Sequence, residues 1–223
     1  MEERYSRNLP AVSAEEQAAL AHKRVLVVGC GGLGGYLIEY LARMGVGEIT
    51  AVDGDVFELS NLNRQLLSTQ ALLGTSKALA ARDRVRAVNP DVRIEAIEAF
   101  LDEDNADGLV RGRDLVLDAL DSAPARLILE DTCARAGTAI VHGAIQGWSV
   151  QVSVVPAGSG LLHRLYGSAK APAEKTSLPC TPPFCAAVQA AEAVKLLCGR
   201  PSELEGKLLL ADLRRMDWDI LTI

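Results

Sequence analysis

Two segments near the start of the chain carry residue types that suit phosphate and ribose binding. The first is the glycine-rich run from Val28 to Gly35, which follows an apolar stretch expected to form a buried strand. Glycines in such a run permit a tight turn, close approach of the backbone to phosphate and close helix packing. The candidate phosphate-binding residues are Gly29, Gly31, Gly32 and Gly34. The second segment ends in Asp53, about twenty residues further on, where a carboxylate can accept hydrogen bonds from ribose hydroxyls.

Amides and cations that follow Asp53 favour a triphosphate over a dinucleotide. They are Asn61, Asn63, Arg64, Gln65 and Lys77. NAD carries only a diphosphate and needs no such cluster, whereas a triphosphate with a departing pyrophosphate does. We therefore expect nucleotidyl transfer from ATP, and the same cluster argues against an NAD-dependent oxidoreductase. Asp55 joins the candidate nucleotide-binding residues because it can order this loop, the alternative being a carboxylate solvated in a turn.

Several short motifs occur together in a characteristic order. They are GCGGLGG, VDGD, SNLNRQ, GTSKA, the end of DLVLDALDS and QAAEAVKLL. In order and spacing they resemble the ThiF/MoeB/HesA family of adenylyltransferases, the bacterial relatives of ubiquitin-activating enzymes. The resemblance implies ATP-dependent adenylation of the C-terminal glycine carboxylate of a small ubiquitin-fold sulfur carrier ending in Gly-Gly. The pathway implied is thiamin, molybdopterin or related sulfur transfer.

The same resemblance implies roles for single residues. Asp53 would hold the ribose, the glycines would cradle phosphate, and Arg64, Gln65 and Lys77 would face the polyphosphate. Asp121 would engage Mg²⁺, which prefers oxygen ligands such as a carboxylate at the carboxyl end of a strand.

The residues around Asp121 also have simpler interpretations. From local sequence alone, Asp121 and Ser122 could equally cap the helix that begins near Pro124. Ser122 stands where the family usually has Asn. Arg126 follows at the family's spacing, although an exposed helix arginine would look the same, and Asp118 is expected to be structural.

The N-terminal segment Arg4-Tyr5-Ser6-Arg7 resembles the family's RYxR arm. In the family, the second arginine of this arm reaches the nucleotide site of the partner subunit, so Arg7 implies a catalytic role in trans and a homodimer. A short terminal arm has little apolar content with which to fold on its own subunit, so Tyr5 and Arg7 are expected to dock on a partner. The alternative is a frayed, solvated segment.

Five cysteines, without an even and regularly spaced framework, are interpreted as reduced thiols. The two CxxC pairs that bind zinc in many family members are missing, and the spacing of His163, Cys180 and Cys185 is unlike a zinc hairpin, so no zinc is expected. Cys180 corresponds roughly to a cysteine that takes part in sulfur transfer in the thiamin branch. It is therefore a candidate catalytic residue, Cys185 is a weaker one, and an unreactive loop or core thiol is the alternative.

Charge and hydropathy limit the class of partner. A net charge of −6 on 223 residues argues against nucleic acid, since binding it needs a basic face. The apolar runs are too short for a membrane span and the first residues lack a signal-peptide core, so we expect a cytoplasmic protein without membrane contact.

A tRNA threonylcarbamoyladenosine dehydratase-like enzyme and a non-catalytic nucleotide- or partner-binding subunit of the same fold are the remaining alternatives.

Strand and helix patterns alternate along most of the chain. Strands are expected at 24–28, 48–52, 92–97, 114–118 and 138–141, and helices at 32–43, 75–88, 103–110 and 123–136. A later alternating run, 149–155, predicts an antiparallel strand, and a helix over 184–198 and a strand over 207–212 follow. The pattern predicts an α/β, Rossmann-like, doubly wound fold whose sheet is mainly parallel with antiparallel C-terminal strands. We expect a single adenylation domain over 1–223, with an N-terminal arm (1–22) and an irregular crossover loop (158–183).

Overall fold

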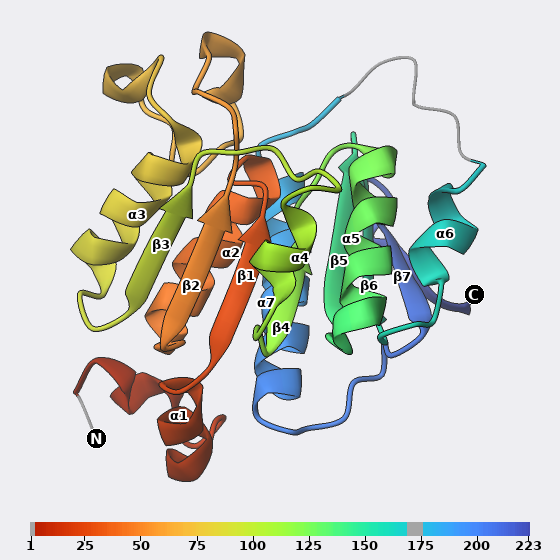
Figure 1. Cartoon of the computed structure of the whole chain (residues 1–223), viewed down its shortest axis with the longest axis horizontal. Helices are drawn as coiled ribbons and strands as arrows, with labels where there is room; N and C mark the ends of the chain where they lie inside the picture. Colours follow the sequence, from red (N-terminus) through yellow and green to blue (C-terminus); the bar gives the residue numbers. More distant parts are fainter. Residues whose placement is uncertain (1–2, 169–175) are drawn as a thin grey trace.

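The sheet has a spatial strand order of β3-β2-β1-β4-β5-β6-β7-β8 in the computed structural model, which describes residues 3–168 and 176–223 (Figure 1). Neighbouring strands from β3 across to β5 run parallel, and the pairs β5–β6, β6–β7 and β7–β8 are antiparallel. This confirms the predicted doubly wound sheet. The strands are β1 Arg24–Val28, β2 Glu48–Val52, β3 Arg93–Ile97, β4 Leu115–Asp118, β5 Ile140–Gln146, β6 Ser149–Val155, β7 Lys207–Asp212 and β8 Asp217–Thr222.

Helices cover both faces of this sheet. One layer consists of α2 (Gly32–Met44), α3 (Lys77–Val88) and α7 (Thr181–Leu197), and the other of α4 (Ala106–Val110), α5 (Ala123–Ala136) and α6 (Leu161–Tyr166). Because side chains alternate along a strand, β1 serves both layers: Val25 and Val27 belong to the first core, Leu26 and Val28 to the second. Each layer therefore has its own apolar core against a shared sheet.

The strand order reverses at β1, which lies between β2 and β4. In doubly wound sheets, the connections on either side of such a point leave in opposite directions and open a crevice beyond the carboxyl ends of the strands. The glycine-rich turn follows β1 at this point, Asp53 follows β2, and Asp121 follows β4. The topology thus brings together three segments that are far apart in the sequence.

Two expectations about the last third of the chain were wrong. The segment 158–183 was expected to be irregular, yet it contains α6 and the first turn of α7, which starts at Thr181; residues 169–175 of it lie outside the described residues. No strand was expected after residue 212, whereas β8 pairs with the whole of β7.

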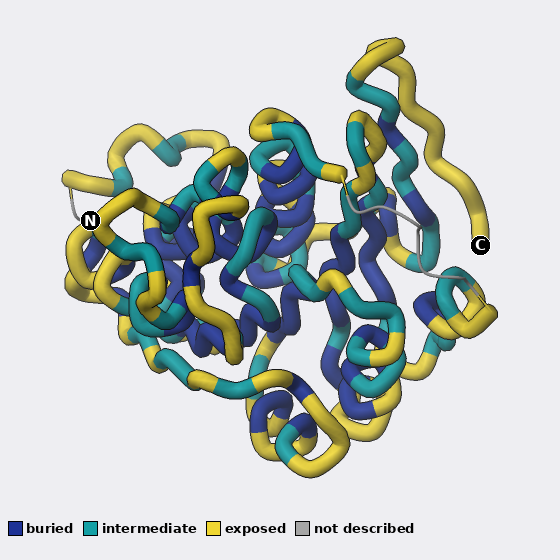
Figure 2. The backbone as a smooth tube through the Cα atoms, turned by 90° about the horizontal axis from the view of Figure 1, so that it is seen from above, coloured by how far each residue is buried: buried dark blue, intermediate teal, exposed yellow. Residues whose placement is uncertain are grey.

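β8 forms an exposed edge of the sheet. All six of its residues are exposed, including Trp218 and Ile220, and Figure 2 shows the strand as exposed up to the C terminus. Asp217 and Asp219 alternate with these apolar residues. In the part of the chain that the structure describes, no helix is long and apolar enough to cross a membrane.

The N-terminal arm docks on its own chain. It comprises a short 3-10 helix, Glu3–Asn8, and α1, Ala14–Leu20, and lies beyond the amino ends of the strands (Figure 1). The Tyr5 hydroxyl accepts a hydrogen bond from Asn89 Nδ2 at 2.8 Å, and the Tyr5 ring lies directly against Gly45. The expectation that Tyr5 docks on a partner subunit was therefore wrong.

Candidate active site

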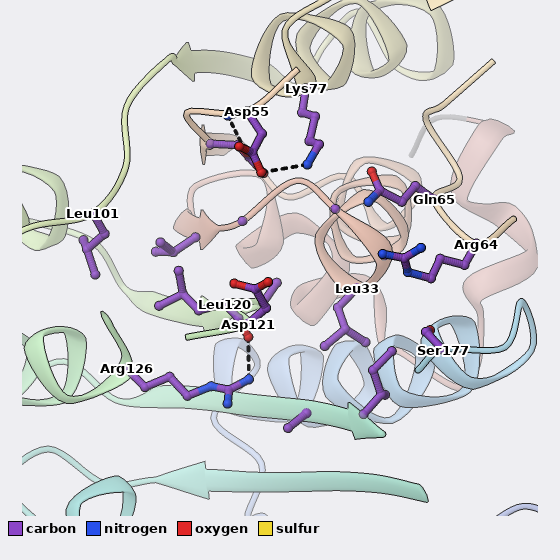
Figure 3. A pocket seen from close by; sticks show the side chains of 18 of the residues that line it. Leu33, Asp55, Arg64, Gln65, Lys77, Leu101, Leu120, Asp121, Arg126 and Ser177 are labelled. Carbon is purple, nitrogen blue, oxygen red and sulfur yellow. Dashed lines mark hydrogen bonds and ion pairs between the residues drawn. The ribbon is translucent and has the colours of Figure 1, made fainter. Parts of the chain in front are cut away.

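A cavity of about 620 Å³ lies at the carboxyl ends of β1, β2 and β4. It brings together most of the residues that the sequence singled out, and Figure 3 shows Asp55, Arg64, Gln65, Lys77 and Asp121 around one space. The lining residues with candidate roles are Gly29, Gly31, Gly32, Asp53, Asp55, Asn63, Arg64, Gln65, Lys77 and Asp121.

The glycine turn divides into residues that line the cavity and one that packs the fold. Gly29 has φ +97°, and a Cβ there would lie 2.6 Å from the carbonyl oxygen of Ala119. A Cβ on Gly34 would lie 1.7 Å from the carbonyl oxygen of Gly29, and Gly34 does not line the cavity. We therefore correct the role of Gly34 from phosphate binding to the close packing of α2 against β1.

Asp53 is held by backbone amides at the end of β2. Its Oδ2 accepts a hydrogen bond from the Cys30 amide at 2.7 Å, and its Oδ1 accepts one from the Asp55 amide at 2.8 Å. Burial raises the pKa of Asp53 above its ordinary value, although these two hydrogen bonds oppose the shift. The carboxylate is thereby fixed in orientation on the cavity wall, as binding of ribose hydroxyls requires.

Lys77 and Arg64 supply positive charge from two different segments. Lys77 opens α3 with only 7% of its surface exposed, and its Nζ lies 2.9 Å from Asp55 Oδ2. Arg64 donates to the Ser60 carbonyl at 3.0 Å and to Asn63 Oδ1 at 2.9 Å. Asp55 therefore orders the start of α3 as well as facing the cavity.

Gln65 and Asn61 have different roles, although both are buried in the same loop. Gln65 lines the cavity beside Gly31, and its Oε1 has no hydrogen-bond partner within residues 3–168 and 176–223. Asn61 does not line the cavity; its Oδ1 accepts from the Glu58 amide at 3.0 Å. We therefore correct Asn61 from a nucleotide-binding residue to one that shapes the loop carrying Arg64 and Gln65.

Asp121 lies on the turn between β4 and α5, and the side chain of Arg126 holds this turn in place. Ser122 occupies the N-cap position of α5, so Asp121 is not the helix cap. Arg126 is buried, contrary to an exposed helix arginine, and its guanidinium donates to the Leu120 carbonyl and, at 3.2 Å, to Asp118 Oδ2. This clamp fixes the backbone immediately before Asp121.

Asp118 and His142 form a buried polar pair under the cavity that the sequence did not reveal. They are register partners on the neighbouring strands β4 and β5, and His142 Nδ1 lies 2.6 Å from Asp118 Oδ2. Burial raises the pKa of Asp118, but the guanidinium of Arg126 and the hydrogen bond from His142 outweigh it and hold this pKa below its ordinary value. Burial lowers the pKa of His142 despite Asp118, so the imidazole is neutral near pH 7. The signal that could have found the pair is one ionisable residue in each of two consecutive apolar strands.

The two candidate cysteines differ in environment. Cys180 is exposed at the N-cap of α7 and does not line the cavity. Cys185 is fully buried, and burial raises the pKa of its thiol far above the ordinary value, which is the opposite of what a nucleophile needs. We therefore correct Cys185 to a core thiol.

His163 pairs with Asp131 at 2.8 Å, and across the described residues no three His, Cys, Asp or Glu side chains form a metal-binding group.

Arg7 is exposed and far from the cavity of its own chain. It lies on the arm whose contacts, Asn89 and Gly45, precede β3 and β2, whereas the cavity lies beyond the opposite ends of these strands. Arg7 and the cavity of its own chain therefore lie at opposite ends of the sheet.

The cavity has the chemistry that Mg-ATP requires. Gly31 and Gly32 leave backbone exposed at the start of a thirteen-residue helix, where amides and the helix dipole favour phosphate. Lys77 and Arg64 provide cations. Gln65 adds a side-chain amide whose NH2 group can donate to phosphate, and its oxygen, which has no partner among the described residues, is an acceptor suited to Mg²⁺ or a water bound to it. Asp121 provides a carboxylate, and Mg²⁺ bound to phosphates needs only one or two of these. The residues present thus fit both groups.

Comparisons with known proteins agree with this geometry. The chain matches the ThiF family over residues 5–223. It is 39% identical to the SAMP-activating enzyme E1 of Haloferax volcanii, with 97% of this chain and 83% of that protein covered. It is 37% identical to the sulfur carrier protein adenylyltransferase of Thermus thermophilus, with 99% and 87% covered. The crystal structure of E. coli MccB with ATP shares the fold, with a TM-score of 0.85, 20% identity, and coverage of 100% of this chain and 72% of that one. The chain therefore belongs to the ThiF family and is an adenylyltransferase.

Proposed function

We propose that this enzyme adenylates the C-terminal carboxylate of a small ubiquitin-like sulfur carrier protein ending in Gly-Gly. The observation that carries the proposal is the single cavity in which a glycine turn, two cations and Asp121 meet at the reversal of strand order. Support comes from the relatives, whose names specify SAMP activation and sulfur carrier adenylylation. The carrier would feed thiamin, molybdopterin or related sulfur transfer.

The reaction joins a carboxylate oxygen to the α-phosphorus of ATP. The bond between the α-phosphorus and the oxygen that bridges to the β-phosphorus breaks, and pyrophosphate leaves with that electron pair. Lys77 and Arg64 stabilise the charge that develops on the leaving group, and Gln65 binds the polyphosphate. Asp53 holds the ribose, so that the α-phosphorus faces the carboxylate. Asp121 would hold Mg²⁺, which would supply neutralisation of the phosphate charge.

ATP–pyrophosphate exchange with a Gly-Gly-ending carrier tests the proposal. The wild type should exchange, and Asp121→Asn should lower kcat by roughly a hundredfold while the protein stays folded, because its carboxylate acts on charge in the transition state. Asp131→Asn is the matched control, since Asp131 is exposed, pairs with His163 and does not line the cavity. Comparison of thiamin-type and molybdopterin-type carriers identifies the pathway.

The alternatives give different outcomes in the same assay. A non-catalytic subunit would bind ATP without exchange, and a dehydratase-like enzyme would exchange only with modified tRNA present. A response to NAD but not to ATP in calorimetry would contradict adenylation altogether.

We also propose that the working unit is a homodimer in which Arg7 completes the nucleotide site of the partner subunit. The proposal is supported by the position of Arg7, exposed at the edge of the sheet opposite to its own cavity. Arg7→Ala and Asp121→Ala should each be inactive, and mixing them should restore activity in hybrids with one intact site. Absence of recovery after demonstrated subunit exchange would contradict the proposal.

Cys180 is a candidate for a later sulfur-transfer step, because it is exposed at the N-cap of α7. Cys180→Ser should then leave ATP–pyrophosphate exchange unchanged and abolish formation of the carrier thiocarboxylate. Wild-type thiocarboxylate formation by this variant would make Cys180 a surface thiol.

A further inference from the structure

One wall of the cavity, beyond the nucleotide-binding residues, is polar but uncharged. It is the β5–β6 hairpin, on which Gln146 faces Ser149 and Ala144 faces Gln151 in the strand register. All four residues line the cavity and share one face of the hairpin, since directly opposite residues lie on the same side of a sheet. Neutral amides and hydroxyls suit the N–H and C=O groups of a peptide backbone, whereas phosphate is bound by cations.

Tyr166, at the end of α6, adds a hydroxyl to this wall. It also lines the cavity, and the guanidinium carbon of Arg126 lies 4.8 Å from the centre of its ring. The hydroxyl oxygen lies 3.0 Å from His142 Nε2 and 3.1 Å from Gln151 Oε1. A hydroxyl has one proton to donate, so it cannot satisfy both acceptors at once.

The buried pair under the cavity decides where this proton goes. His142 Nδ1 carries a proton because it lies 2.6 Å from the ionised carboxylate of Asp118. In a neutral imidazole the other nitrogen, Nε2, is then an acceptor, and Tyr166 is the donor that reaches it. Having given its proton to His142, the Tyr166 hydroxyl can only accept from the Gln151 amide, so Gln151 is stable with its NH2 group on the Tyr166 oxygen and its carbonyl oxygen turned to the cavity that it lines.

We propose that Gln151 is a specificity residue that accepts a hydrogen bond from a backbone N–H of the carrier's extended C-terminal tail. Tyr166 and His142 are positioning residues: by pairing with each other they leave the Gln151 carbonyl open to the cavity. This inference rests on the proposed function, because it requires a substrate with a peptide tail. The inference specifies which group of the tail the enzyme recognises: a main-chain N–H donor and not a side chain.

Ester substitution tests which donor is read. The probe is a short synthetic peptide ending in Gly-Gly, and a series in which one amide N–H near the carboxylate at a time is replaced by an ester oxygen. With the wild type, one ester should lower kcat/KM for the peptide by roughly three- to tenfold, the effect of one neutral hydrogen bond. The KM for ATP should not change.

Variants then identify the acceptor. In Gln151→Met, which keeps the length of the side chain, the sensitive ester and its amide should have equal kcat/KM. Tyr166→Phe should reduce the discrimination, because Gln151 loses the neighbour that orients it. Tyr36→Phe, a tyrosine of α2 that does not line the cavity, should keep the wild-type ratio.

The outcomes separate the two proposals. A wild type that adenylates neither the peptides nor a Gly-Gly-ending carrier overturns the proposed function and the inference with it. A wild type that uses amide and ester peptides equally at every position overturns the inference alone, as does a Gln151→Met variant with the wild-type ratio. The ester series on the wild type decides the point even if a variant fails to fold.

Discussion

Replacing Asp118 with Asn tests the buried network at its centre. Asp118 is fully buried, and its carboxylate accepts hydrogen bonds from Arg126, from His142 and, at 2.9 Å, from the Leu120 amide. The substitution keeps the shape of the side chain but leaves the guanidinium of Arg126 buried without a counter-charge. Breaking such a pair from one side costs about 3 to 5 kcal/mol. In a protein of this length, each kcal/mol lowers Tm by roughly 2 to 4 °C, so Tm should fall by roughly 6 to 20 °C.

An exposed pair of the same chemistry is the control. Asp107 lies 2.7 Å from Arg135, and both side chains are 59% exposed. Asp107→Asn should therefore leave Tm unchanged within the error of a thermal melt followed by circular dichroism. If Asp118→Asn and Asp107→Asn had the same Tm, the buried network would contribute little to stability. The reasoning that an ionised Asp118 is the counter-charge of Arg126 would then be refuted.

Four further substitutions test other parts of the structure. Gly34→Ala should prevent soluble expression, because its Cβ would lie 1.7 Å from a backbone oxygen, whereas Gly108→Ala, which meets no atom within 4 Å, should stabilise α4 by about 0.5 to 1 kcal/mol in urea titrations. Burial lowers the pKa of His142 in the folded protein below the value of about 6.5 expected for the unfolded chain. Below that pH the unfolded chain binds a proton that the folded protein does not, so the free energy of unfolding falls as the pH falls. His142→Asn should flatten the urea midpoint between about pH 7 and 5. Lys77→Met should lower kcat/KM for ATP roughly ten- to hundredfold in pyrophosphate exchange, with little change in Tm.

The parallel half of the fold could be predicted because its strands are buried on both faces and therefore form continuous apolar runs. β1 is an example: four of its five residues are buried, and Gly29 follows directly. β8 could not be predicted in this way, because it buries no residue and is held by its backbone ladder to β7. The period-2 alternation of Asp217 and Asp219 with Trp218 and Ile220 is the signal that could have revealed it.

The residues that line the cavity could be predicted from the sequence more completely than the side-chain pairs beneath it. Asp53 follows β2 and Asp121 follows β4, the two strands that flank β1, so their meeting depends only on the order of strands. The pairing of Asp118 with His142 depends on which strand lies beside β4 and in what register, and neither is written in a local pattern. The contact between Gln151 and Tyr166 could not be predicted for the same reason, because an antiparallel hairpin and a short helix bring these two residues together.

The C-terminal edge strand also bears on how the protein behaves at high concentration. Its outer N–H and C=O groups, which pair with no strand in the part of the chain that the structure describes, could template a second copy of the same strand, and Trp218 and Ile220 offer that copy an apolar face. Asp217 and Asp219 alternate with them, so an antiparallel pairing of two such edges would bring four carboxylates into one ribbon. Their mutual repulsion opposes this pairing and weakens as added salt screens it. Storage at low ionic strength should therefore preserve the dispersed protein, and concentrated salt should favour fibrous or amorphous association through this edge.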